Sequence, residues 1–256
     1  MTGRFLDIHE RLKLATQARI GLGNAGTGLP TTPMLDFQIA HARARDAVHA
    51  ELSGERVADG LPAEPLYLAS RAADRATYLQ RPDLGRRLTP ESRDRLDALE
   101  NGPWDLVIVI ADGLSATATA AHGAAVAAAL LERLADWHIA PLCIARQARV
   151  ALADEIGEVL GAALSVILIG ERPGLSSPDS LGAYLTWGPR VGRIDSERNC
   201  VSNIRPPHGL SYDAAADKLV WLMRSARALR ASGVTLKDEQ RDDGGRLGFS
   251  RAGDVK

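Results

Sequence analysis

The sequence predicts an α/β protein in which a helical N-terminal region, residues 1–100, precedes a Rossmann-like domain with a largely parallel sheet, residues 101–236. Two observations lead to this prediction. The first hundred residues are dense in arginine, alanine, leucine and aspartate and contain no strand-like run. After residue 101, three short apolar runs rich in β-branched residues alternate with segments of helical length. That order is typical of right-handed crossovers and a parallel sheet.

Three helices are expected in the N-terminal region. Residues 36–52 place apolar side chains near helical spacing, and residues 66–79 do so less regularly. Residues 90–99 form a third candidate, with Thr89 as N-cap and Pro90 at the first helical position. Glycine, proline and arginine between these segments indicate loops. We therefore expect this region to be all-helical.

The predicted Rossmann-like domain begins with a short, fully apolar strand. Residues 105–112 read DLVIVIAD, as expected of a strand buried on both faces. The further elements expected are an alanine-rich helix opened by Gly113 and Ser115 and ending near 136, strands at 140–145 and 164–171, a helix at 153–160, edge strands at 182–187 and 200–204, and a long helix at 212–231. The polar, glycine-rich segment 237–256 is expected to be a disordered tail.

Charge and composition exclude several classes of protein. Lysine and arginine number 31 against 32 aspartates and glutamates, so the net charge of -1 does not favour nucleic acid or an anionic membrane as partner. The longest apolar runs, 106–111 and 124–131, are far too short for a membrane span. The charged N-terminus lacks the apolar core of a signal peptide. Cys143 and Cys200 form neither a metal cluster nor a disulfide framework. We expect a cytoplasmic protein without a metal site.

A glycine-rich segment at residues 21–26, GLGNAG, matches the dinucleotide-binding pattern G-x-G-x-x-G. That pattern requires a strand before it and a helix that opens at the glycines. Here a charged helical stretch precedes it, and a threonine- and proline-rich loop follows. A loop between two helices is therefore the favoured interpretation.

Asp112 and Ser115 follow the first predicted parallel strand, where open parallel sheets bind ligands. Both side chains are also suited to capping the next helix. The sequence leaves these two interpretations open. No G-x-S-x-G elbow, Walker loop or H-E-x-x-H motif is present, so no catalytic residue is assigned.

Residues 170–190, GERPGLSSPDSLGAYLTWGPR, and 197–205, ERNCVSNIR, resemble the signature region of the small subunit of ethanolamine ammonia-lyase. The likeness extends to ARIGLGNAGTGLPT, RPDLGRRL, IADGLSATA and RVALADEIGEVLGA, and covers most of residues 12–237. GERPGL and CVSNIR at this separation are specific to that family.

The resemblance implies a function that this chain shares with a partner. In that family, a large TIM-barrel subunit binds ethanolamine, and adenosylcobalamin lies between the two subunits of a hetero-oligomer that forms acetaldehyde and ammonia. On matching motifs, the small subunit contacts the cofactor at Val150, Glu171 and Cys200. Many members are associated with bacterial microcompartments, so the resemblance leaves open whether the cytoplasmic enzyme is free or enclosed.

Residues 136–141, DWHIAP, approach the D-x-H-x-x-G pattern by which some cobalamin domains place a histidine on cobalt. The glycine is absent, so His138 is not expected to ligate the metal. The cofactor's own benzimidazole is expected in that position instead.

Two alternatives remain beside the cofactor-holding subunit. A stand-alone nucleotide-binding α/β enzyme would retain NAD or FAD on the isolated chain. A purely structural docking subunit would need a partner but would be insensitive to substitution of Val150, Glu171 or Cys200. The two specific motifs favour the cofactor-holding subunit.

Overall fold

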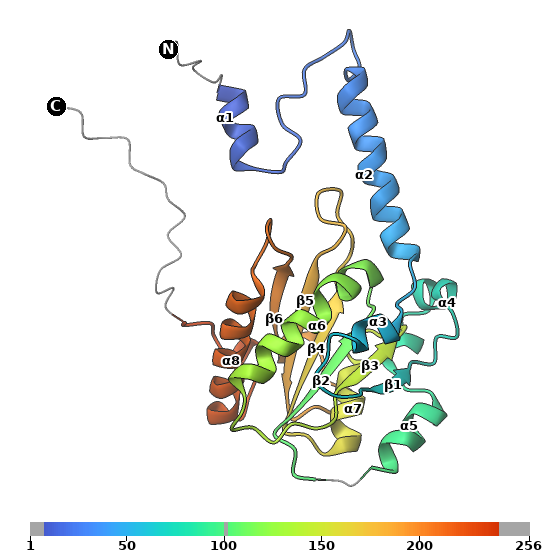
Figure 1. The fold of residues 1–256 in the computed structure, drawn as a ribbon, viewed down its shortest axis with the longest axis vertical. Helices are drawn as coiled ribbons and strands as arrows, with labels where there is room; N and C mark the ends of the chain where they lie inside the picture. The colour runs from blue at the N-terminus through green and yellow to red at the C-terminus, as the bar shows by residue number, and fades with distance from the viewer. Residues whose placement is uncertain (1–7, 100–101, 241–256) are drawn as a thin grey trace, which may run out of the picture.

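The computed structural model describes residues 8–99 and 102–240 of the chain (Figure 1). The helical elements are α1 (Ile8–Ala15), α2 (Thr31–His49), α3 (Gly54–Ala58), α4 (Arg75–Gln80), α5 (Pro90–Asp97), α6 (Ala116–Arg133), α7 (Leu152–Leu160) and α8 (Tyr212–Leu229), with short 3-10 turns at Leu84–Arg86, Asp195–Glu197 and Gly233–Thr235. The predicted tail falls largely in residues 241–256, which lie outside the described residues.

A single six-stranded sheet organises the chain, and the predicted α/β class is confirmed. Its strands are β1 (Leu66–Ala69), β2 (Leu106–Ala111), β3 (Cys143–Arg146), β4 (Leu164–Gly170), β5 (Leu181–Trp187) and β6 (Arg198–Ile204), in the order β1-β3-β2-β4-β5-β6. The first four strands in that order pair in parallel, whereas β5 runs antiparallel to both of its neighbours, β4 and β6. Strand β6 lies at the edge as expected, but β5 lies inside, between β4 and β6.

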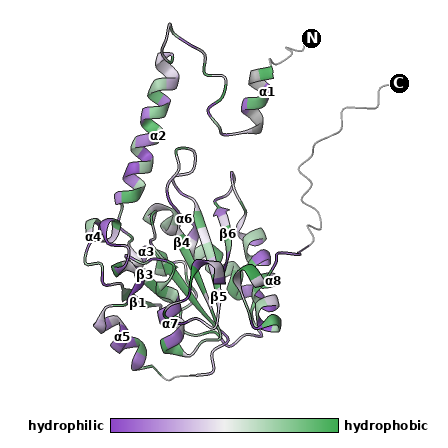
Figure 2. Cartoon of the chain, turned by 180° about the vertical axis from the view of Figure 1, so that it is seen from behind, coloured by the Kyte–Doolittle hydropathy of each residue, from purple (hydrophilic) through white to green (hydrophobic). Residues whose placement is uncertain are grey.

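Helices cover both faces of the sheet (Figure 1). Ile108 and Ile110 of β2 belong to the apolar core beneath α6 and α8, and Val107 and Val109 belong to the core beneath α5 and α7. All six residues of β2 are buried. Figure 2 shows the hydrophobic colour gathered in these central strands. Each large apolar side chain buried in this way contributes about 1.5–3 kcal/mol, which explains why β2 is fully apolar.

The expectation of an all-helical N-terminal region is wrong at residues 66–69, and of the helix predicted over 66–79 only the part from Arg75 on is helical. Residues 66–69 form the edge strand β1, which pairs in parallel with β3. Helix α4 begins at Arg75. Asp74 is its N-cap and accepts a hydrogen bond from the Thr77 amide at 2.7 Å. Leu68 is buried while Tyr67 is exposed, a strand alternation that the sequence contains but that is only four residues long. The domain division at residues 100 and 236 stays a prediction.

The other helix predictions in this region hold. Thr89 caps α5 by accepting from the Ser92 amide at 3.1 Å, with Pro90 at the first helical position. Helix α2 starts at Thr31, five residues before the predicted start. Pro33 lies in its first turn, where proline is tolerated because the amide there has no helical partner.

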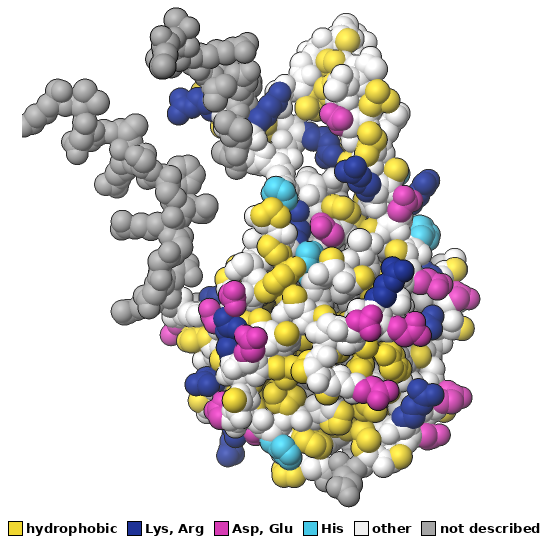
Figure 3. All heavy atoms as spheres, viewed as in Figure 1, with side chains coloured by type: hydrophobic (Ala, Val, Ile, Leu, Met, Phe, Trp, Pro, Cys, Tyr) yellow, Lys and Arg dark blue, Asp and Glu magenta, His cyan; other side chains and the backbone are white. Residues whose placement is uncertain are grey.

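Helix α2 projects away from the sheet (Figure 1). Within this helix only Ala40 and Ala47 are buried. Its exposed large apolar side chains are Met34, Leu35, Phe37 and Ile39, and Figure 3 shows hydrophobic side chains along the projecting helix. Apolar groups left in water on a projecting helix indicate an interaction surface.

Candidate functional site

The carboxyl ends of strands β2, β3 and β4 lie at the same end of the sheet, and the connections that follow these strands diverge there. The chain leaves β2 for α6 on one face and leaves β3 for α7 on the other. Such a divergence opens a crevice beyond the carboxyl ends of the strands, the usual ligand position in open α/β sheets. A cavity of about 250 Å³ occupies this position, and we call it the edge cavity. Its lining residues are Tyr78, Gly113, Leu114, Arg149, Val150, Ile169, Gly170, Glu171, Arg172 and Tyr184.

A second cavity of about 300 Å³ lies beside the first. The two share Arg149 and Val150. Because four of its lining residues are arginines, we call it the arginine cavity. It is lined by Pro82, Arg86, Arg149, Val150, Ala151, Arg193, Ile194, Asp195 and Arg198. A ligand larger than either cavity could therefore extend across both.

The structure brings two of the three predicted contact residues together. Val150 and Glu171 both line the edge cavity, from the loops that follow β3 and β4. Cys200 lies on β6, opposite Tyr184 of β5, and does not line this cavity. Desolvation raises the pKa of the Cys200 thiol above its ordinary value. The raised pKa disfavours the thiolate form, which is the form that binds metals.

The Glu171 carboxylate is held from three sides. It accepts short hydrogen bonds from the hydroxyls of Ser180 and Ser202, and the Asn203 amide lies 3.4 Å from it. A Cβ at Gly182 of β5 would lie 2.7 Å from the carboxylate, so a larger residue there would displace Glu171 from this position. None of the described ion pairs joins Glu171 to an arginine. The carboxylate is thus fixed in place by hydroxyl donors, and no described arginine lies within ion-pair distance of it.

Asp112 and Ser115 both serve the fold. Asp112 is 2% exposed and accepts hydrogen bonds from the amides of Gly113 (2.9 Å), Gln147 (2.7 Å) and Ala148 (3.0 Å). Burial raises its pKa above the ordinary value, and these donors act in the opposite direction. The Ser115 hydroxyl caps α6 by accepting from the Ala118 amide. The loop faces the edge cavity through Gly113 and Leu114 instead.

The GLGNAG segment lies between α1 and α2, and the predicted glycine loop is confirmed. In the described part of the chain no strand precedes it. Its three glycines, Gly21, Gly23 and Gly26, all have positive φ, a backbone conformation that favours glycine. The geometry therefore lacks the strand–loop–helix unit of a dinucleotide site.

His138 lies at the amino end of the strands, away from both cavities. Its amide donates to the carboxylate of Asp105, the residue that precedes β2, at 3.0 Å. Its ring packs on Trp104, with 4.3 Å between the ring centroids. Over residues 8–99 and 102–240, no group of three or more His, Cys, Asp or Glu side chains could hold a metal ion. No described helix is both long and apolar enough to span a membrane.

Sequence reasoning missed the aromatic and arginine side chains of the site. Arg149 stacks on Tyr78, with its guanidinium carbon 4.2 Å from the ring centroid, and donates to the Tyr78 carbonyl at 3.0 Å. Burial raises the pKa of Tyr78 to about 12. The signal that could have identified Arg149 is its position beside Val150 in the R-V-A motif.

Comparisons with known proteins agree with the sequence resemblance. A family model described as ethanolamine ammonia-lyase light chain (EutC) matches residues 6–237. The chain is 57% identical over 238 residues to an ethanolamine ammonia-lyase small subunit of Azotobacter vinelandii, covering 90% of this chain and 88% of that one. It is 56% identical over 233 residues to the small subunit of Rhodopseudomonas palustris, covering 89% of each. Identity to that of Ralstonia nicotianae is 52% over 237 residues, covering 90% and 87%.

Proposed function

Because this chain belongs to the family of the ethanolamine ammonia-lyase small subunit, we propose that it forms one wall of an adenosylcobalamin site completed by the large subunit. As a member of that family it is a subunit of a carbon–nitrogen lyase that acts in ethanolamine degradation. The proposal has three parts. They are the adenosylcobalamin cofactor, its contact with Val150, Glu171 and Cys200, and its position between the two subunits.

The observation that carries the proposal is the edge cavity, which Val150 and the fixed carboxylate of Glu171 both line. Pockets that enclose a drug-sized ligand measure about 300–1,000 Å³. A cavity of about 250 Å³ is too small to enclose a corrinoid and fits one edge of it. The carboxamide side chains of cobalamin are hydrogen-bond donors, and the carboxylate of Glu171 is an acceptor. The residues present therefore fit the cofactor as a wall and not as a complete pocket.

The division of labour follows from these residues. When bound, the cofactor supplies radical chemistry for the deamination. Glu171 would orient the corrin through its amide groups, while Val150, Leu114 and Ile169 would exclude water from that side. None of these groups exchanges a proton or electron with substrate in this proposal, so no catalytic residue is assigned to this chain.

The large subunit is the proposed partner of α2 as well. The relatives are named as small subunits, which implies a large one. The exposed apolar residues of α2 defined above would be covered by that contact. Arg75 connects α2 to the cavity loop, because it donates to the carbonyls of Val48 (2.6 Å) and Gly113 (2.7 Å). A cytoplasmic location, inside or outside a microcompartment, is part of the same proposal.

Co-expression with the matching large subunit tests this function. We expect acetaldehyde release from ethanolamine only when both chains and adenosylcobalamin are present, because neither chain alone would enclose the cofactor. Each chain assayed alone with the cofactor is the control. A complex that releases acetaldehyde without the cofactor, or a nucleotide retained by this chain alone, would contradict the proposal.

Replacing Glu171 by alanine is expected to weaken adenosylcobalamin binding about 10- to 100-fold, because hydrogen bonds to charged groups contribute about 1.5–3 kcal/mol. Spectroscopic titration of the assembled enzyme measures the affinity, and size-exclusion chromatography checks assembly. Glu171→Gln keeps an acceptor oxygen and should retain part of the affinity. Glu132→Ala, an exposed change on α6, is the control. Equal affinity of Glu171→Ala and wild type would remove Glu171 from the site.

A further inference from the structure

The arginine cavity lies beside the proposed corrinoid wall and differs from it in charge. Arg86, Arg149, Arg193 and Arg198 line it, with Asp195 as the one acidic lining residue. The edge cavity instead carries the carboxylate of Glu171 beside Arg172 and the shared Arg149, and its other lining residues are apolar, aromatic or glycine. A single ligand that spans the shared residues would thus meet a hydrogen-bond acceptor at one end and positive charge at the other.

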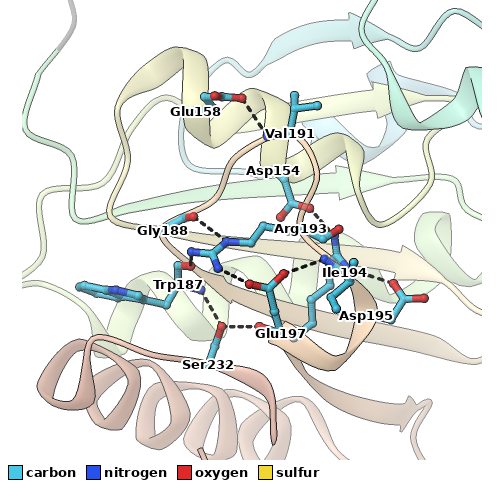
Figure 4. A network of polar contacts seen from close by, with 11 residues as sticks. Asp154, Glu158, Trp187, Gly188, Val191, Arg193, Ile194, Asp195, Glu197 and Ser232 are labelled. Carbon is cyan, nitrogen blue, oxygen red and sulfur yellow. Dashed lines mark hydrogen bonds and ion pairs between the residues drawn. The ribbon is translucent and has the colours of Figure 1, made fainter. Parts of the chain in front are cut away.

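Two of the four arginines form ion pairs with carboxylates of the protein itself. Arg193 donates to the carbonyls of Gly188 and Trp187 and pairs with Glu197, a network that Figure 4 shows. Arg198 is 2% exposed in its side chain and is neutralised by Asp154 and Asp195. These arginines hold the loop between β5 and β6 in place and form a fixed rear wall for the cavity.

The other two arginines, Arg86 and Arg149, are not neutralised by a carboxylate of the described residues. Neither Arg86 nor Arg149 is within ion-pair distance of a carboxylate among the residues that the structure describes. One nitrogen of Arg149 donates to the Tyr78 carbonyl, while its Nε is buried and has no hydrogen-bond partner. The nitrogen left for a ligand is therefore Nη1, which makes no hydrogen bond to the residues that the structure describes.

Gly85 fixes the position of Arg149. The Gly85 carbonyl accepts from the Arg149 amide at 2.8 Å, and a Cβ at Gly85 would lie 2.8 Å from the Arg149 Cγ. Tyr78 supports the other side of the guanidinium. A guanidinium held in this way suits an oxygen of a phosphate, to which arginine donates charge-assisted hydrogen bonds.

We propose that the arginine cavity binds the phosphodiester of the cofactor's nucleotide tail, with Arg149 and Arg86 as its ligands, while the corrin amides reach Glu171. This inference rests on the proposed function. The phosphodiester is the one anionic group of cobalamin, and the shared residues Arg149 and Val150 place its pocket next to the corrin wall. Arg149 and Arg86 would then fix how the tail is directed along this subunit.

The test compares two cofactor forms on the assembled two-subunit enzyme. Adenosylcobinamide has the same corrin ring and adenosyl group as adenosylcobalamin but lacks the nucleotide and its phosphodiester. Equilibrium dialysis gives the affinity of each form for wild type, Arg149→Gln and Arg86→Gln. Arg86 is exposed, so its replacement leaves the fold intact. Arg224→Gln on α8, whose side chain is 59% exposed, is the control for loss of one charge.

We expect Arg149→Gln and Arg86→Gln each to weaken adenosylcobalamin binding about tenfold, with less than a twofold change for adenosylcobinamide. Unchanged affinity for adenosylcobalamin, or an equal loss for both forms, would overturn the assignment of the phosphodiester to this cavity while leaving the corrin wall intact. If wild type bound neither form, the proposed function itself would be wrong, and this inference with it.

Discussion

Replacement of Arg198 by methionine is expected to lower the free energy of unfolding by about 3–5 kcal/mol, because it leaves the buried charge of Asp154 without its partner. Both side chains are 2% exposed. The pair joins α7 to the first residue of β6. Urea denaturation of the purified chain measures the change.

The second variant in this test removes both charges. Asp154→Leu combined with Arg198→Met should be more stable than Arg198→Met alone, because no uncompensated charge remains in the core. Recovery should be partial, since Arg198 also donates to the Arg193 carbonyl. If the double variant were no more stable than the single one, the cost would come from lost packing and not from the orphaned aspartate.

Arg133→Met is the matched control for this cycle. Arg133 also pairs with two aspartates, Asp213 and Asp217, but their side chains are 80% and 59% exposed. Exposed pairs contribute about 0–1 kcal/mol, so this variant should lie close to wild type. A larger loss of stability in Arg198→Met than in Arg133→Met would show that burial of the ion pair causes the loss.

The central strands could be predicted because their burial is complete. A strand with helices on both faces must be apolar throughout, and β2 and β4 are apolar enough to be identified from composition alone. Strand β1 escaped prediction because an edge strand of four residues has only two inward positions, and leucine and alanine suit a helix equally well. Pairing with β3, a tertiary contact, decides its conformation.

The site was predictable only in part, for a different reason. Val150 and Glu171 follow parallel strands, so the topology alone places them at one edge. Arg86 and Arg149 are 63 positions apart in the printed sequence, and Gly85 brings them together through a backbone contact that no local pattern reports. Cys200 lies in a recognisable motif, but its strand β6 lies two places from β4 in the sheet. The motif therefore identifies the residue without placing it at the edge cavity.

Asp112 connects the fold to the site. It follows β2, yet two of the three amides that it accepts from belong to the loop after β3 that continues into Arg149 and Val150. Gln147 in that loop has a φ of 53°, an unfavourable backbone conformation for a residue with a side chain. The carboxylate of Asp112 thus holds a strained loop against the carboxyl end of the neighbouring strand.

Asp112→Ala is therefore expected to lower the free energy of unfolding by about 3–5 kcal/mol, since each buried amide left unsatisfied costs about 1–3 kcal/mol. Asp112→Asn keeps one acceptor oxygen and should fall between alanine and wild type. Thermal and urea unfolding measure both variants, with Asp136→Ala, 68% exposed in its side chain, as the control. Because the loop after β3 would loosen first, hydrogen exchange at Gln147 and Ala148 should rise before the core amides of β2 respond. An equal rise in hydrogen exchange at the loop amides and at the amides of the sheet would show that Asp112 supports the whole fold and not the site loop in particular.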